Sequence, residues 1–134
     1  MAEPLAFEEL DFLYTPSRDV PADMADFVNV FGARVVFAIE DGGIQAALLE
    51  LTDKPPRILL TSHVEGDRPI MVYRVPDHAA AVATLRDRGW KPARSLEIPQ
   101  GPCSSFRTPG GHRVAVYQLS RPGVLAHFTG RRDF

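Results

Sequence analysis

Short apolar runs alternate with proline- and glycine-rich breaks along most of the chain. In the first half, residues 10–14 form an apolar and aromatic run that is closed by Thr15-Pro16-Ser17, as in a strand that ends in a turn. Apolar residues at helical spacing follow between Pro21 and Gly32, which predicts a helix. Three β-rich segments complete this half, at residues 34–40, 44–51 and 57–62. The first half therefore predicts a strand, a helix and three strands.

The second half repeats this order. Residues 70–75 read as a strand, and the segment from Pro76 to Gly89 reads as a helix. Strand-like segments follow at residues 90–98, 103–108 and 113–119, and a short tail with one or two helical turns occupies residues 120–134. The landmarks of the two halves are evenly offset by 58, 57 and 56 residues, for Phe12 with Ile70, Gly32 with Gly89 and Leu59 with Ala115.

This repetition predicts a duplicated α+β fold. Each half leaves one sheet face without a helix, and two such faces can meet around a shared interior. We therefore expect two βαβββ repeats that form one curved, partly closed mixed sheet, or cup, with the helices on its outer face. The expected single domain spans residues 1–134, with repeat one at about 9–64, repeat two at about 69–119 and the tail at 120–134.

The composition excludes some classes of binding partner, but it does not indicate a reaction. The net charge of −2 and the pI of about 6.1 give no electrostatic reason to expect nucleic acid or a membrane surface as a partner. The one cysteine, Cys103, rules out an internal disulfide and suits a reducing compartment. The N-terminus has no secretory pattern, so we expect a cytoplasmic protein.

Strand alternation predicts which side chains line the cup. Asp11 and Leu13 are expected on the outer face, opposite Phe12 and Tyr14. An apolar and aromatic lining with one or two cations suits a partly apolar organic ligand that carries an anionic or hydrogen-bonding group. The same side chains could instead fill the cup as a core, and both readings stay open. The candidate ligand-binding residues are Phe12, Tyr14, Leu59, Ile70, Val72, Arg74, Arg113, Ala115 and Tyr117.

Two segments carry a resemblance to a known family. The stretch from Val75 to Gly89 holds an alanine-rich helix that ends in Arg-Gly, and Thr108-Pro109-Gly110-Gly111-His112 forms a turn before the last strand. Together with the repeat, they resemble the vicinal oxygen chelate superfamily, also called the glyoxalase, bleomycin-resistance and dioxygenase group. The resemblance covers residues 10–119 and implies a cup-shaped fold. Its bleomycin-resistance branch implies a homodimer.

The resemblance also implies where a metal would lie. Enzymes of this superfamily hold a metal on four positions that correspond here to Phe12, Leu59, Ile70 and Ala115, all apolar. We therefore expect no metal, no cofactor and no identified catalytic residue. The interpretation that follows favours a metal-independent binding protein over an enzyme, one that sequesters or senses an aromatic or partly apolar small molecule.

Two alternatives remain beside this interpretation. One is a metal-dependent lyase, isomerase or dioxygenase of the same superfamily with non-standard ligands, such as His63 or Glu65. The other is a structural or interaction protein with a filled cup. Cys103 reads as a small buried strand residue, because nothing near it in sequence supplies a base that would activate its thiol.

Overall fold

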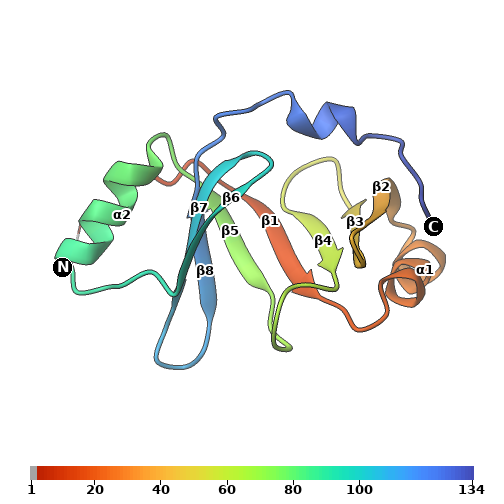
Figure 1. Ribbon diagram of the computed structural model, residues 1–134, viewed down its shortest axis with the longest axis horizontal. Helices are drawn as coiled ribbons and strands as arrows, with labels where there is room; N and C mark the ends of the chain where they lie inside the picture. The colour runs from red at the N-terminus through yellow and green to blue at the C-terminus, as the bar shows by residue number, and fades with distance from the viewer. Residues whose placement is uncertain (1–2) are drawn as a thin grey trace.

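The computed structural model describes residues 3–134 and contains one eight-stranded sheet flanked by two helices (Figure 1). The strands lie in the order β2-β3-β4-β1-β5-β8-β7-β6. The elements of the first half are β1 (Glu9–Pro16), α1 (Val20–Phe31), β2 (Arg34–Asp41), β3 (Ile44–Glu50) and β4 (Arg57–Thr61). Those of the second half are β5 (Ile70–Arg74), α2 (His78–Asp87), β6 (Arg94–Ile98), β7 (Gly101–Arg107) and β8 (Arg113–Tyr117).

The sheet has the same arrangement on either side of its centre. The first strands of the two halves, β1 and β5, lie antiparallel in the middle. Each pairs in parallel with the last strand of its own half, β1 with β4 and β5 with β8. Each half then continues outward through antiparallel pairs to an edge strand, β2 or β6. The predicted fold class, two βαβββ units in one curved mixed sheet, is confirmed, and both units come from the same chain.

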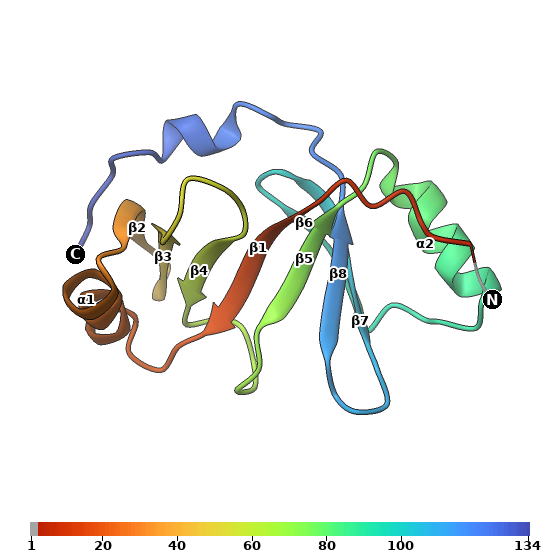
Figure 2. The ribbon, with the colours of Figure 1, turned by 180° about the vertical axis from the view of Figure 1, so that it is seen from behind.

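The helices begin and end where local chemistry favours it. The carboxylate of Asp19 accepts from the amide of Ala22 at 3.1 Å at the start of α1, and Gly32 ends the helix with a φ of 73°. At the start of α2, the carboxylate of Asp77 accepts from the amide of Ala80 at 3.0 Å. The helices cover opposite ends of the convex face, α1 over the β3–β4 end and α2 over the β7–β8 end (Figure 2). The concave face is therefore left to the tail and to the interior side chains.

The C-terminal tail crosses the cup from the second half to the first (Figures 1 and 2). It leaves β8, forms a 3₁₀ helix at Val124–His127, and packs Leu125 and Phe128 against the interior cluster. Its last residues run along the edge strand β2. The amides of Gly130 and Asp133 donate to the carbonyls of Val36 and Ala38, and the amide of Ala38 donates to the carbonyl of Arg131. The predicted helical turn is confirmed, but its docking across the cup was not foreseen.

Three details differ from the expectation drawn from the sequence. A bulge between Leu10 and Phe12 interrupts the alternation of β1, so the expectation that Asp11 faces outward is wrong. Instead, its carboxylate accepts from the hydroxyl of Tyr117 inside the cup. Strand β6 starts at Arg94 rather than at residue 90, and β7 starts at Gly101, so that the turn is confined to Pro99 and Gln100.

No helix within residues 3–134 is long and apolar enough to cross a bilayer.

Candidate functional site

The middle of the cup is packed with side chains, and this packing divides the interior. The buried cluster there contains Phe12, Val72, Ala115 and Tyr117, and the ring of Tyr14 lies 5.9 Å from that of Phe12. Space remains on either side of this packing, as two separate sites. We call the space near the loop after β4 the lower pocket and the space beneath the tail the upper chamber.

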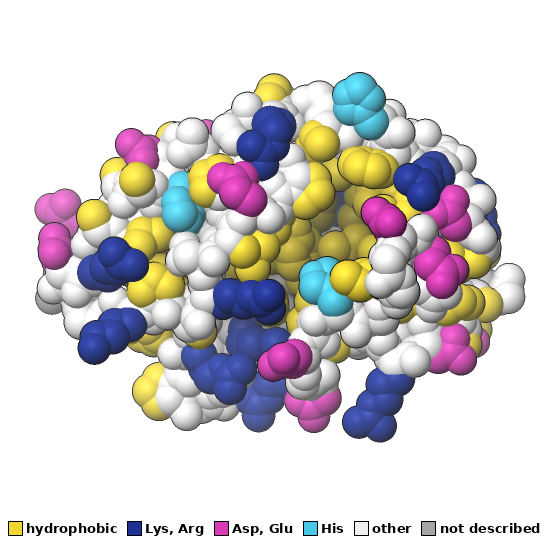
Figure 3. All heavy atoms as spheres, viewed as in Figure 1, with side chains coloured by type: hydrophobic (Ala, Val, Ile, Leu, Met, Phe, Trp, Pro, Cys, Tyr) yellow, Lys and Arg dark blue, Asp and Glu magenta, His cyan; other side chains and the backbone are white. Residues whose placement is uncertain are grey.

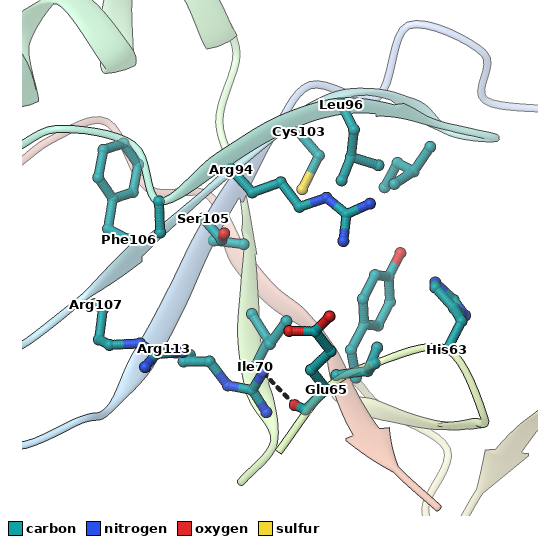
Figure 4. Close-up of a pocket in the computed structure, with 15 residues that line it drawn as sticks. His63, Glu65, Ile70, Arg94, Leu96, Cys103, Ser105, Phe106, Arg107 and Arg113 are labelled. Atoms are coloured by element: carbon teal, nitrogen blue, oxygen red, sulfur yellow. Dashed lines mark hydrogen bonds between the residues drawn. The ribbon is translucent and has the colours of Figure 1, made fainter. Parts of the chain in front are cut away.

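The lower pocket has a volume of about 230 Å³ and an apolar floor. Ile70 and Ala115 come from the central strands β5 and β8, and Ile98 and Cys103 come from the β6–β7 hairpin. Polar groups surround this floor, and Figure 4 shows the Glu65 carboxylate turned into the pocket below the guanidinium of Arg94. In the space-filling view, the hollow has hydrophobic atoms in its depth and Lys and Arg side chains beside it (Figure 3).

The loop between β4 and β5 supplies two of these polar groups, and an arginine of β8 holds the loop in place. The guanidinium of Arg113 donates to the backbone carbonyl of Glu65 at 2.6 Å and to that of Arg68. On the same loop, Nδ1 of His63 lies 2.5 Å from the hydroxyl of Thr61. Glu65 is thus fixed through its backbone, while its carboxylate has no hydrogen-bond or ion-pair partner within the described part of the chain.

Burial and nearby charge shift the titration of several pocket groups. Burial lowers the pKa of His63, and the positive charge of Arg94 acts in the same direction, so the imidazole is neutral at pH 7. Burial raises the pKa of Tyr14, which keeps its phenol protonated. Burial also raises the pKa of the Cys103 thiol to about 12. This cysteine is 7% exposed, so the prediction of a small buried strand residue is confirmed.

The candidate ligand-binding residues named from the sequence do not form one site. Val72 and Leu59 lie in or against the central cluster. The remaining candidates are divided between the two spaces: Tyr14, Ile70, Arg113 and Ala115 line the lower pocket, and Phe12, Arg74 and Tyr117 line the upper chamber.

A buried polar network occupies one wall of the upper chamber. Besides accepting from the hydroxyl of Tyr117, the carboxylate of Asp11 lies 3.4 Å from the guanidinium of Arg74. Asp11 is 8% exposed and Tyr117 is 1% exposed. Burial raises the pKa of Tyr117, and its hydrogen bond to the Asp11 carboxylate adds to this effect. The network therefore joins the centre of β1 to the ends of β5 and β8.

Sequence reasoning missed several polar residues that the structure brings to the two spaces. His63 is an exposed loop residue, as its place after the strand predicts, and it also lines the mouth of the lower pocket beside Glu65. Arg94 was not considered, although alternation along β6 places it on the same face as Leu96 and Ile98. Gln100 belongs to a turn, and no local pattern indicates that its side chain lies inside the protein.

Within residues 3–134, the interior does not bring together the set of donor atoms that a metal ion requires. Phe12, Leu59, Ile70 and Ala115 all lie in or against the same apolar cluster, and their side chains offer no donor atom. Across residues 3–134, no three His, Cys, Asp or Glu side chains converge as a metal-binding group. His63, Glu65 and Cys103 line the lower pocket, but they do not converge as the three or four ligands that a divalent site usually takes from protein.

Comparisons with known proteins identify the fold. No family model and no curated protein sequence matches the chain. Among solved structures, methylmalonyl-CoA epimerase from Mycobacterium tuberculosis superposes with a TM-score of 0.72 at 17% identity, over 91% of this chain and 95% of that one. Methylmalonyl-CoA epimerases belong to the vicinal oxygen chelate superfamily. The chain has the fold of that superfamily.

Two further structures agree with this result. A methylmalonyl-CoA epimerase in complex with methylmalonyl-CoA and NH4+ has a TM-score of 0.69 at 14% identity, with 86% of this chain and 96% of that one covered. A hypothetical protein from Bacillus halodurans has a TM-score of 0.69 at 11% identity, with 82% and 93% covered. At these identities the likeness establishes the superfamily fold, and the chemistry must be argued from the residues of this chain.

Proposed function

We propose that the lower pocket is the active site of an isomerase that moves a proton on a small organic acid or its thioester. The observation that carries the proposal is the unpaired carboxylate of Glu65, which is turned into a pocket with an apolar floor and a protonated phenol. Of the interpretations drawn from the sequence, this takes the isomerase from the metal-dependent alternative but not its metal. The epimerases among the structural neighbours favour it over a binding protein.

The pocket offers a place for an anionic substrate. Arg94 and Arg107 line it, and neither side chain has an ion pair or hydrogen bond to any residue from 3 to 134. Guanidinium groups bind carboxylates and phosphates through paired hydrogen bonds. We assign these two arginines to the anionic end of the substrate, while Ile70 and Ala115 contact its apolar part.

The proton transfer uses Glu65 and Tyr14. The carboxylate of Glu65 removes the proton from the carbon next to the carbonyl, and the electrons of that C–H bond form the enolate. The phenol of Tyr14 stays protonated, so it donates a hydrogen bond to the carbonyl oxygen as negative charge develops there. The enolate then recovers a proton from Glu65 or, on the opposite face, from water. Return on the opposite face inverts the centre, and Glu65 then gives its proton to the hydroxide that the water leaves, which restores the carboxylate.

No step of this proposal runs through a metal. The four superfamily positions hold apolar residues, and His63 with Glu65 supplies two donors, so the residues do not fit a divalent ion. Elemental analysis of protein purified without chelators tests this part separately. Stoichiometric zinc, iron, manganese or nickel would contradict it.

Exchange of the α-proton with solvent tests the reaction. The protein is incubated in D2O with methylmalonyl-CoA and with short 2-substituted carboxylic acids, and loss of the α-proton signal is followed by proton NMR. We expect exchange on at least one compound and a fall of at least about a hundredfold in Glu65→Gln, in the range that a lost general base costs.

Asp67→Asn is the matched control. Asp67 lies two residues further along the same loop, in the neighbouring surface groove rather than in the lower pocket. This variant is expected to keep the exchange rate. Saturable binding without exchange would overturn the proposal and support a binding protein. The homodimer implied by the resemblance stays a prediction that sedimentation analysis can check.

A further inference from the structure

The upper chamber lies outside the proposed active site and is lined by a buried polar atom that has no hydrogen-bond partner. It encloses about 210 Å³ between the central strands and the tail. Phe12 and Leu125 supply apolar walls, and Arg57, Arg74 and Lys54 bring positive charge. Its roof is formed by Leu119, Pro122 and Leu125, which belong to the segment that crosses from one repeat to the other.

Gln100 contributes a buried oxygen without a partner. Its side chain lines the upper chamber, and the residue is 5% exposed. Of the buried side-chain oxygen and nitrogen atoms in residues 3–134, Oε1 of Gln100 is the one that has no hydrogen-bond partner. The side-chain amide of Gln100 also meets the phenol of Tyr14, where it acts to lower the pKa of that phenol as an N–H donor does, so Oε1 is the atom of this amide left without a partner. Nearly all buried polar atoms in native proteins are paired with protein or water, so this oxygen calls for a donor.

The position of Gln100 is fixed by its backbone. Its carbonyl accepts from the amides of Ser120 and Arg121 at 3.1 and 3.0 Å. At the next position, Gly101 lies so close to Gln118 that an added Cβ would overlap the carbonyl oxygen of Gln118. The turn therefore cannot withdraw from the tail, and the amide of Gln100 is held inside the cup.

The charges around the chamber favour an anion. Three cationic side chains line it against two carboxylates, those of Asp11 and Asp53. Asp11 is already engaged by Tyr117 and Arg74, and the side chain of Asp53 is 99% exposed. The ammonium of Lys54 has no ion pair with any of residues 3–134. Arg57 lies 3.8 Å from the carboxylate of Glu50, and Arg74 is engaged by Asp11. Lys54 is therefore the cation of this lining without a carboxylate partner in residues 3–134, beside the unpaired oxygen of Gln100.

We propose that the upper chamber binds a small hydroxy acid, with its carboxylate at Lys54 and Arg57 and its hydroxyl group donating to Oε1 of Gln100. The apolar walls contact the short carbon chain. A simple fatty acid satisfies the cations but leaves Gln100 without a donor, whereas an amine meets the wrong charge. The chamber is too small to enclose a nucleotide, and this separates the site from one for a coenzyme.

Matched pairs of acids that differ by one hydroxyl group test the assignment. The full-length protein, labelled with ¹⁵N, is titrated with 2-hydroxybutyrate, 3-hydroxybutyrate and butyrate, and with malate and succinate. At least one hydroxy acid is expected to bind about tenfold more tightly than its deoxy partner, as one hydrogen bond to a buried acceptor provides. The shift changes should centre on Leu125 and the side-chain amide of Gln100.

Two variants of Gln100 isolate its contribution. Gln100→Met keeps a similar length without the oxygen, and Gln100→Leu is a second version in case one variant folds poorly. Either is expected to abolish the tenfold preference for the hydroxy acid while the deoxy acid binds as before. Gln45→Leu, on β3, is the control and should keep the preference. Lys54→Ala should weaken both members of a pair alike.

Three results would overturn the proposal. One is the absence of any preference within every pair, which would mean that water alone occupies the chamber. Another is a preference that survives both changes of Gln100. The third is a set of shift changes centred on His63 and Glu65, which would place the acids in the lower pocket. Because the readout is binding at Leu125 and Gln100, these outcomes are independent of the α-proton exchange reaction.

Discussion

The hydrogen bond between Asp11 and Tyr117 is expected to be one of the strongest single polar contributions to stability. The two groups come from residues 106 positions apart, and both are buried. Tyr117→Phe removes a hydrogen bond to a charged acceptor without changing the ring, which typically costs about 1.5–3 kcal/mol. Asp11→Ala leaves the buried hydroxyl of Tyr117 without its acceptor and should cost about 3 kcal/mol.

The double variant gives the sharper test. Because both single changes remove the same hydrogen bond, the double variant should lose less than the two single losses added together. We expect a coupling free energy of about 2 kcal/mol. Arg74 contributes little to this value, since its side chain is 33% exposed and the ion pair is screened by water.

Urea unfolding followed through the fluorescence of Trp90, the single tryptophan, provides the measurement. Tyr73→Phe is the control, because the Tyr73 hydroxyl has no hydrogen bond to residues 3–134, and it should change stability by less than about 0.5 kcal/mol. If the Asp11 and Tyr117 changes prove additive within about 0.5 kcal/mol, the inferred network does not contribute as described.

Three other predictions follow from the described contacts. Removal of residues 130–134 deletes the carbonyl of Arg131 that accepts from the Ala38 amide. Hydrogen exchange at the Ala38 amide should therefore become at least about tenfold faster, while exchange at Val72 in the central strands stays slow. Native Cys103 should react with a thiol reagent at pH 8 at least about a hundredfold more slowly than in denaturant, because burial raises its pKa to about 12; equal rates would refute its burial. Burial lowers the pKa of His63 and His78 below the ordinary value of 6.5, so the unfolded chain binds protons more readily and stability should fall as the pH drops below about 6.5. Changing both residues to Asn should make the urea midpoint depend less on pH between pH 7 and pH 5.5. An unchanged pH dependence would contradict the shifts.

The fold could be predicted because its signals are local. Pro21 and Gly32 mark the ends of α1, and the same punctuation at Pro76 and Gly89 marks the second helix. Each half therefore reveals its own element order. The pairing of β1 with β5 inside one chain could not be predicted, because the same pattern also suits an exchange of repeats between two chains.

The interior could not be predicted to the same depth, because its decisive features are not local. The bulge near Leu10 shifts Asp11 inward, and strand alternation contains no sign of it. The tail docks on a strand about 95 residues earlier in the chain, where Asp133 accepts from the amide of Glu40. Gln100 looks like an ordinary turn residue until the tail covers it. The positions of Asp11, the tail and Gln100 all depend on contacts between residues that are far apart in the sequence.

The docked tail also makes the two edges of the sheet unequal. An exposed edge strand can recruit a strand from another molecule, which is a common route to aggregation. At β2, residues 130–133 cover part of this edge and satisfy the amide of Ala38. At the other end, β6 closes the sheet with four consecutive exposed residues, Arg94 to Glu97. The charges of Arg94 and Glu97 disfavour pairing of this edge with another strand, so replacing both with apolar residues should promote self-association through β6. Loss of the tail should instead promote self-association through β2.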